Sequence, residues 1–324
     1  MSTDLHALQG GTYLTFDIGG TKIASGLVRL PSNTDAAPVV TEATSIPTLP
    51  ERGGDDILAR LLQLAERRLA DCRASGVTVD GIGIGSAGVV DSASGVILSA
   101  TDLIPGWAGQ RIAEAFARLT DVGFHMVGDV GAHGLGEATY GAGRGYARVL
   151  SVGVGTGIGG AVVEHGALLT GAHGVAGHIG HMSHGLGEGV PCSCGASAGH
   201  IEPVASGTGL GTLYNRMRPA GTPEVPDGKA VSDLAASGDG FAARVMSVSA
   251  KALGECLAGA CNMLDPDAVV VSGSVANAGP LWWDALREGF RAGALPLVAP
   301  TPLLAGTLGG DAPLVGAAVA VARA

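Results

Sequence analysis

Hydrophobic positions along the chain follow two patterns, short apolar runs and longer segments in which apolar residues recur every three or four positions. Short runs bounded by Gly, Asn or Asp are typical of strands, and the longer period is typical of amphipathic helices. We expect strands at 12–16, 23–30, within 31–50, at 79–84, 124–127 and 148–154, as a hairpin within 161–169, and at 268–271. We expect helices at 55–74, from 112, and at 131–140, 207–217, 238–264, 282–292 and 311–324.

The two halves of the chain open in the same way, with a strand, a Gly-Thr turn and a second strand. The first turn is Asp17-Ile18-Gly19-Gly20-Thr21-Lys22, and the second is Gly155-Thr156-Gly157-Ile158-Gly159-Gly160. This duplication indicates two related α/β lobes that hold a nucleotide between them. We expect residues 1–122 to form the first lobe and 123–310 the second, with the final helix 311–324 returning to the first.

Both turns have the chemistry of phosphate binding. Gly19 and Gly20 lack a Cβ, so their backbone can approach an anion closely, and Asp17 offers a carboxylate for Mg²⁺. A tight turn that binds nothing remains the alternative. The second turn matches the dinucleotide motif G-x-G-x-x-G, but a strand follows it where that motif needs a helix. An NAD-dependent enzyme is therefore a minor alternative.

Asp129 follows the predicted strand 124–127 and precedes a helix, which is where open α/β sheets place their ligands. We interpret it as the general base that accepts the proton of an attacking hydroxyl. The alternative is that Asp129 caps the helix, and the two roles can coexist. A turn carrying Thr101, Asp102 and Trp107 has an aromatic ring that either stacks on a sugar face or covers the core.

Residues 177–202 gather four of the nine His and two of the five Cys of the chain. Soft sulfur and imidazole ligands at short spacing suit tetrahedral Zn²⁺, and we predict a structural site made of His181, Cys192, Cys194 and His200. His178 and Glu202 then lie beside the metal and can face a substrate. A polar loop with an unbound Cys pair is the alternative.

Composition limits the class of protein. The chain of 324 residues is 46% hydrophobic and has a net charge of −10, which favours a large core and argues against a nucleic-acid surface. No uninterrupted apolar stretch is long enough to cross a bilayer, so we expect no membrane partner. The first residues have no signal-peptide features, so we expect a cytoplasmic protein whose Cys are thiols or metal ligands.

Together, the two turns and the stretch from Cys192 to Glu202 resemble the ROK family of sugar kinases and sugar-responsive repressors, from about Thr12 to Ala324. The resemblance implies an actin-like, hexokinase-type ATPase fold with an interlobe cleft, and ATP and Mg²⁺ as cofactors beside structural Zn²⁺. It also implies a homodimer. The repressor branch carries a helix-turn-helix domain ahead of its first turn, and only 16 residues precede Asp17 here.

The resemblance also assigns residues to roles. The phosphate and ATP set is Asp17, Gly19, Gly20, Thr21, Lys22, Thr156, Gly157, Ser272 and Gly273. The sugar set is Ser86, Gly88, Thr101, Asp102, Asp129, His178, His181 and Glu202. Asp129 matches the catalytic aspartate, and His181 matches the zinc histidine of the family.

Three departures from the family pattern bear on the substrate. His178 stands where most members have Glu, which is similar to bacterial N-acetylmannosamine kinases. Gly128 replaces the Asn that usually precedes the base, and His200 replaces a third Cys after one inserted residue. Zn²⁺ accepts either ligand.

The sequence therefore predicts an ATP- and Mg²⁺-dependent sugar kinase that phosphorylates the 6-hydroxyl of a hexose or N-acetylhexosamine, with N-acetylmannosamine slightly ahead of glucose. The alternatives are a glucokinase that uses ATP or polyphosphate, and a sugar-binding protein that has lost turnover.

Overall fold

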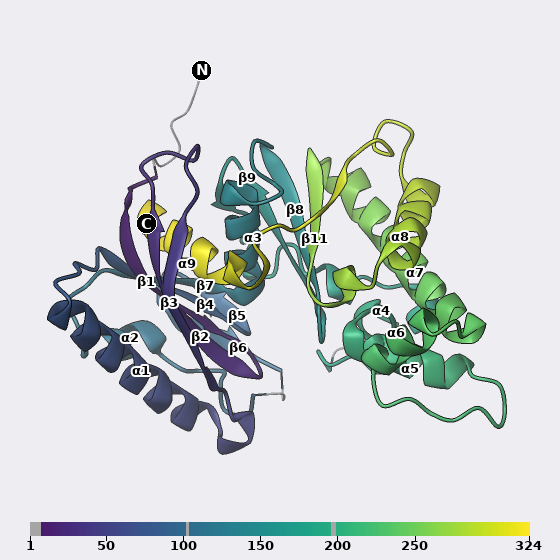
Figure 1. Ribbon diagram of the computed structural model, residues 1–324, viewed down its shortest axis with the longest axis horizontal. Helices are drawn as coiled ribbons and strands as arrows, with labels where there is room; N and C mark the ends of the chain where they lie inside the picture. The colour runs from purple at the N-terminus through teal and green to yellow at the C-terminus, as the bar shows by residue number, and fades with distance from the viewer. Residues whose placement is uncertain (1–7, 102–103, 196–198) are drawn as a thin grey trace. The chain divides into compact units, whose positions relative to one another are not determined.

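The computed structural model describes residues 8–101, 104–195 and 199–324 (Figure 1). By its contacts the chain divides into two compact units, and each is described by itself. The first unit contains Met1–Ala147, Val162–Ala176 and Thr307–Ala324, and the second contains Arg148–Ala161 and Gly177–Gly306. Neither unit is a continuous stretch of sequence.

The first unit is built on a five-stranded sheet of order β3-β2-β1-β4-β7. β1 and β2 form an antiparallel hairpin that β3 extends, while β4 and β7 continue the sheet in parallel with β1. The carboxyl ends of β1, β4 and β7 therefore meet at one edge. The strands of this unit are β1 (Gly11–Ile18), β2 (Lys22–Leu30), β3 (Val39–Pro47), β4 (Gly81–Ser86), β7 (Phe124–Gly128) and the separate pair β5 (Val89–Asp91) and β6 (Val96–Ser99).

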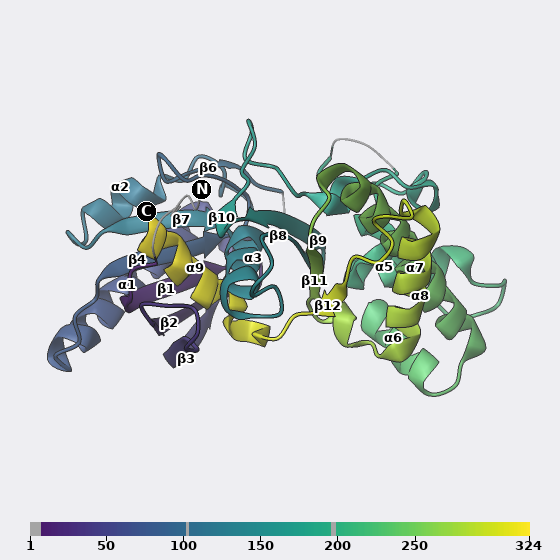
Figure 2. The same ribbon diagram turned by 90° about the horizontal axis from the view of Figure 1, so that it is seen from above.

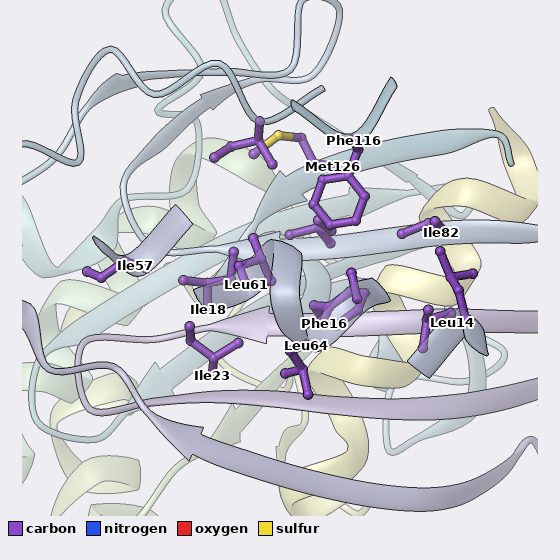
Figure 3. Close-up of a cluster of buried hydrophobic side chains, with 14 of the residues drawn as sticks. Leu14, Phe16, Ile18, Ile23, Ile57, Leu61, Leu64, Ile82, Phe116 and Met126 are labelled. Atoms are coloured by element: carbon purple, nitrogen blue, oxygen red, sulfur yellow. The ribbon is translucent and has the colours of Figure 1, made fainter. Parts of the chain in front are cut away.

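One face of this sheet is covered by α1 (Gly54–Ala74) and α2 (Ile112–Ala117). Successive strand residues project to opposite faces, and the alternate β1 residues Leu14, Phe16 and Ile18 are completely buried on this one. Figure 3 shows them packed among the apolar side chains of α1. Each large side chain buried in this way stabilises the fold by about 1.5–3 kcal/mol.

The opposite face is covered by α3 (Asp129–Tyr140) and α9 (Ala312–Arg323). A Cβ at Gly316 in α9 would lie 1.6 Å from the carbonyl oxygen of Ala132 in α3, so only glycine allows the two helices to approach so closely. Buried Glu137 on α3 also accepts the backbone N–H groups of the segment that leads into α9. α3, which begins at Asp129, is therefore fixed in place by the end of the chain.

The second unit contains most of the other sheet, of order β10-β9-β8-β11-β12, in which β11 is parallel to both β8 and β12. The division into units falls within β9, so β10 belongs to the first unit. The strands of this second sheet are β8 (Arg148–Val154), β9 (Ile158–Glu164), β10 (Ala167–Leu168), β11 (Ala268–Ser272) and β12 (Leu303–Ala305). The helices of the second unit are α4 (Glu202–Ala205), α5 (Gly207–Met217), α6 (Gly228–Ala236), α7 (Gly240–Leu264) and α8 (Pro280–Gly293).

Two glycines let α7 and α8 lie side by side, as Figure 1 shows. A Cβ at Gly289 would lie 2.0 Å from the carbonyl oxygen of Lys251, and one at Gly254 would lie 2.1 Å from that of Leu286. Any larger residue at either position forces the helices apart.

Each strand and helix expected from the hydrophobic pattern is present, with ends moved by a few residues. The expected boundary near residue 122 differs from the division into units, because β7 pairs with β4 and α3 packs against α9 in the first unit. The final helix lies in that unit. Within the described part of the chain, no helix is both long and apolar enough to span a membrane.

Candidate active site

The first glycine turn joins β1 to β2 and is held from one side. The N–H of Gly19 donates to the carbonyl of Lys22 at 3.0 Å, and buried Thr48 donates its hydroxyl to the carbonyl of Gly19 at 2.6 Å. The backbone N–H of Thr48 donates to the carbonyl of Thr21. A Cβ at Gly20 would have no other atom within 4 Å, and Thr21 and Lys22 are exposed. The outer side of the turn can therefore receive an anion.

Asp17 and Asp129 lie close to the same glycine. Asp17 on β1 is in register with Gly85 on β4, and Asp129 follows the neighbouring strand β7. A Cβ at Gly85 would lie 3.5 Å from Asp17 Oδ1 and 3.6 Å from Asp129 Cα. The same Cβ would lie 3.0 Å from the Cβ of Ala132, so Gly85 lets α3 pack closely against β4 and places Asp129 near Asp17.

Both carboxyl groups are costly to ionise where they lie. Burial raises the pKa of Asp17 to about 7, the negative charge of Asp129 acts in the same direction, and Lys22 opposes the shift. Burial also raises the pKa of Asp129, against the effect of the Val130 N–H that donates to its Oδ1 at 2.8 Å. A divalent cation offsets such repulsion, and carboxylate oxygens are the ligands that Mg²⁺ prefers.

The second glycine turn joins β8 to β9 and contacts the first turn of α5. The N–H of Gly207 donates to the carbonyl of Gly155 at 2.7 Å, and the hydroxyl of Thr208 donates to the carbonyl of Thr156 at 2.8 Å. Thr156 itself is exposed. The N–H groups of Gly207, Thr208 and Gly209 are all paired within the unit, so exposed Thr156 is the part of this turn that can meet a phosphate.

Glu202 connects this second turn to the loop that carries the cysteines. Its Oε2 accepts the N–H of Ile158 at 2.9 Å, and its Oε1 accepts the hydroxyl of Ser193 at 2.6 Å. A Cβ at Gly157 would lie 2.7 Å from Glu202 Oε2. The position of the carboxylate therefore depends on a glycine in the turn and on a serine between two predicted metal ligands.

The four predicted zinc ligands come together. One ligand atom from each of His181, Cys192, Cys194 and His200 lies within 4.8 Å of the others. Cys192 Sγ is 3.5 Å from His181 Nδ1, and Cys194 Sγ is 3.5 Å from His200 Nδ1. Backbone hydrogen bonds bring the two ends of the loop together, because the N–H of Ile201 donates to the carbonyl of Met182 and the N–H of His184 donates to that of Gly199.

This geometry fits a zinc ion. Metal–ligand bonds of about 2.0–2.3 Å in a tetrahedron place neighbouring ligand atoms about 3.3–3.8 Å apart, which the two 3.5 Å pairs satisfy. Two thiolates and two imidazoles form a closed ligand set that leaves no open position for a substrate. The His178 ring is stacked 6.2 Å from that of His181, beside the cluster.

The third strand-end turn follows β11. Ser272 is 8% exposed, and its hydroxyl has no hydrogen-bond partner within the described ranges. Gly273 has φ 102°, and a Cβ there would lie 2.4 Å from the carbonyl oxygen of Val154. Glycine is thus required for the chain to turn against β8, and the adenosine role of this pair stays a prediction.

Several expectations need correction. Trp107 is completely buried, with its Nε1 donating to Ser86 Oγ at 3.2 Å and to the carbonyl of Ala87 at 3.1 Å, so it covers the core and does not stack on a sugar. Ser86 has no exposed surface and cannot contact a sugar directly. The N-cap of α3 is Gly128, and Asp129 is the first residue of the helix.

Two further members of the predicted sugar set are Gly88, which the backbone conformation of a turn requires, and Thr101, which is exposed. Gly88 has φ 93°, and a Cβ there would lie 2.6 Å from the carbonyl oxygen of Ser99, so its glycine serves the turn before β5. Thr101 is exposed, and Asp102 lies outside the described residues.

Three residues that support the site were missed from the sequence. Thr48 holds the first turn, Thr208 holds the second, and Ser193 holds Glu202. Only Ser193 could have been suspected from the sequence, because it stands between two predicted metal ligands. The hydroxyls of Thr48 and Thr208 reach carbonyls that are 29 and 52 residues away in the sequence.

Comparison with known proteins agrees with this arrangement. A model of the ROK family matches residues 13–324. The glucokinase of Thermotoga maritima is 32% identical over 313 residues, which are 93% of this chain and 94% of that protein. The N-acetylmannosamine kinase of Yersinia pseudotuberculosis is 32% identical over 267 residues, which are 82% of this chain and 83% of that protein.

A solved structure is similar over nearly the whole chain. The ROK family glucokinase from Streptomyces griseus, in complex with glucose and AMPPNP, has a TM-score of 0.76 at 29% identity. The match covers 95% of this chain and 98% of that one.

Proposed function

The chain belongs to the ROK family and is a carbohydrate kinase with the actin-like ATPase fold, and from that premise we propose that it phosphorylates the 6-hydroxyl of a hexose or N-acetylhexosamine. ATP is the donor, and Mg²⁺ is its companion ion. The observation that carries this proposal is the pair of aspartates, Asp17 and Asp129, which both lie close to Gly85 at the carboxyl edge of the first sheet.

Asp129 is the proposed general base. It takes the proton of the acceptor hydroxyl while the phosphoryl group is transferred. A base works best when its pKa approaches the working pH, and burial raises the pKa of Asp129 in that direction. Its place as the first residue of α3, which α9 packs against, holds the carboxylate in position.

Asp17 is the proposed ligand of Mg²⁺, directly or through water. The ion supplies positive charge for the donor phosphates when it is bound. Gly19, Gly20 and Thr21 present an open turn to those phosphates, and Thr156 and Gly157 present a second one. Positioning and charge stabilisation account for most of the catalysis of phosphoryl transfer.

Zinc is proposed as a structural ion held by His181, Cys192, Cys194 and His200. Because Ser193 lies between two of these ligands and donates to Glu202, the ion fixes a carboxylate proposed to bind the sugar. We further propose that the protein acts in the cytoplasm as a homodimer, which light scattering of the purified chain tests.

N-acetylmannosamine is the first proposed acceptor, because His178 stands beside the zinc ligands where most members have Glu. Glucose is the second candidate. It is supported by a glucokinase relative that matches 93% of this chain, against 82% for the N-acetylmannosamine kinase relative.

The test is an assay of ADP formation with glucose, mannose and the three common N-acetylhexosamines, and a parallel assay of sugar phosphate with polyphosphate as donor. We expect ATP to support turnover of one sugar at least tenfold above the rest. Sugar binding by calorimetry without phosphorylation of any sugar would contradict the proposal and favour a binding protein.

A further inference from the structure

A cavity of about 230 Å³ lies in the first unit, lined by residues that have no part in the proposed kinase site. It is bordered by β7, β10, α3 and the last turn of α9, which Figure 2 shows close together. Most of its wall is apolar. The lining residues are Ser92, His125, Val127, Leu135, His165, Gly166, Ala167, Leu168, Thr170, Ala320, Arg323 and Ala324.

Arg323 brings a positive charge to this apolar cavity. One arm of its guanidinium donates to the carbonyl of Gly166, but its Nε is buried with no hydrogen-bond partner in the described part of the chain. No carboxylate of the described residues forms an ion pair with it. An arginine stays charged even when buried, so the guanidinium favours an anion in the cavity.

The turn beneath the guanidinium is rigid. His165 and Gly166 form a two-residue connection between β9 and β10, with φ values of 49° and 80°. These angles are those of a type I′ hairpin turn, and the N–H of His165 donates to the carbonyl of Ala147 at 2.6 Å. A Cβ at Gly166 would lie 2.9 Å from Arg323 Nη1, so the turn supports the guanidinium directly.

The surroundings of Arg323 are short of hydrogen-bond acceptors. The hydroxyl of Tyr140 interacts electrostatically with Arg323 and is also buried without a partner among the described residues. Burial raises the pKa of Tyr140 to about 12, so the hydroxyl stays a neutral donor. A buried donor without an acceptor is costly, and an anion supplies the missing oxygen atoms.

We propose that this cavity binds a small organic anion, with a carboxylate or phosphate head on Arg323 and a short apolar body against Val127, Leu135 and Leu168. The volume is below the range of about 300–1,000 Å³ that drug-sized ligands fill, which limits the ligand to a small metabolite. The proposal does not depend on the kinase assignment. Because Leu135 belongs to α3, the occupant contacts the helix that begins at Asp129.

Calorimetry on the full chain tests the site with benzoate, with benzyl alcohol as its neutral counterpart, and with inorganic phosphate as a head alone. We expect saturable binding of benzoate, at least tenfold tighter than that of benzyl alcohol. Competition by phosphate indicates that either head is accepted, and its absence indicates a carboxylate site. Equal affinity for benzoate and benzyl alcohol, or no saturable binding of benzoate or phosphate, overturns the proposal.

Two variants locate the binding. Arg323→Met keeps the apolar stem and is expected to remove the preference for the anion, whereas Arg73→Met, at an exposed arginine of α1, is expected to change nothing. Thr170→Trp places a large ring at the exposed rim of the cavity and is expected to weaken benzoate at least tenfold, even if Arg323→Met does not fold. Benzoate binding that survives unchanged in Thr170→Trp and in a folded Arg323→Met contradicts the proposed location.

Discussion

Replacing Glu137 by Gln is expected to loosen the end of the chain from the helix that carries the proposed base. Glu137 is completely buried on α3. Its Oε2 accepts the N–H groups of Ala142 at 3.0 Å and Thr307 at 3.1 Å, and its Oε1 accepts that of Leu308 at 2.9 Å. One carboxylate thus holds both the end of α3 and the segment that enters α9.

The magnitude follows from these three bonds. Glutamine has one carbonyl oxygen, so at least one buried N–H faces an NH₂ group and loses its acceptor, at a cost of about 1–3 kcal/mol. The remaining bonds lose their charge assistance, which is worth roughly 0.5–1.5 kcal/mol each. We expect the free energy of unfolding to fall by about 3 kcal/mol, a large part of the 5–15 kcal/mol typical of native proteins.

Thermal unfolding followed by calorimetry measures this effect. A loss of about 3 kcal/mol in a unit of this size lowers the midpoint by roughly 6–12 °C. The matched control is Glu66→Gln at an exposed glutamate of α1, which should shift the midpoint by less than about 2 °C. A Glu137→Gln midpoint within about 2 °C of the parent protein would refute the reasoning.

Three further predictions concern the site. Gly157→Ala should weaken sugar binding, measured by calorimetry without nucleotide, at least tenfold, because the new Cβ displaces Glu202. The control Gly155→Ala, whose Cβ meets no atom within 4 Å, should change sugar affinity less than threefold. Equal effects of the two variants contradict the proposed role of Glu202. The pKa of Asp17 is about 7 in the folded protein and about 4 in the unfolded chain, so this group makes the free energy of unfolding fall as the pH rises between those values. Asp17→Asn should therefore show a smaller fall in thermal midpoint from pH 5 to pH 8 than the parent protein. An unchanged fall contradicts the raised pKa. Elemental analysis should find one zinc per chain, lost together with thermal stability in Cys192→Ser, and a metal-free parent protein contradicts the zinc site.

The parts of the site that lie on regular elements could be predicted from the sequence. Asp17 lies near the end of one apolar strand and Asp129 follows another, and parallel strands end at one edge, so their proximity could be expected. The proposed zinc ligands could also be picked out, because soft ligands at short spacing have few other uses. The structure brings their four ligand atoms within 4.8 Å of one another, and the zinc ion itself stays a prediction.

The remainder depended on contacts between distant segments. Nothing local shows that Gly85 lets α3 approach β4 at Ala132, or that Thr48 holds the first turn. Trp107 was ambiguous because an aromatic ring in a polar turn suits both a sugar and the core, and only its complete burial decides between them. The boundary near residue 122 follows from the repeated strand, turn and strand that open the two halves, whereas strand pairing and helix packing assign β7 and α3 to the first unit.

The role of Asp129 as the general base is tested by sugar-dependent ADP formation in Asp129→Asn, with Asp121→Asn at an exposed aspartate as the matched control. We expect Asp129→Asn to remain folded and still bind the sugar, while its kcat falls by about 10²–10⁴. Asp121→Asn should keep the parent rate. A folded Asp129→Asn protein that turns over ATP at the parent rate would contradict the assignment of the base.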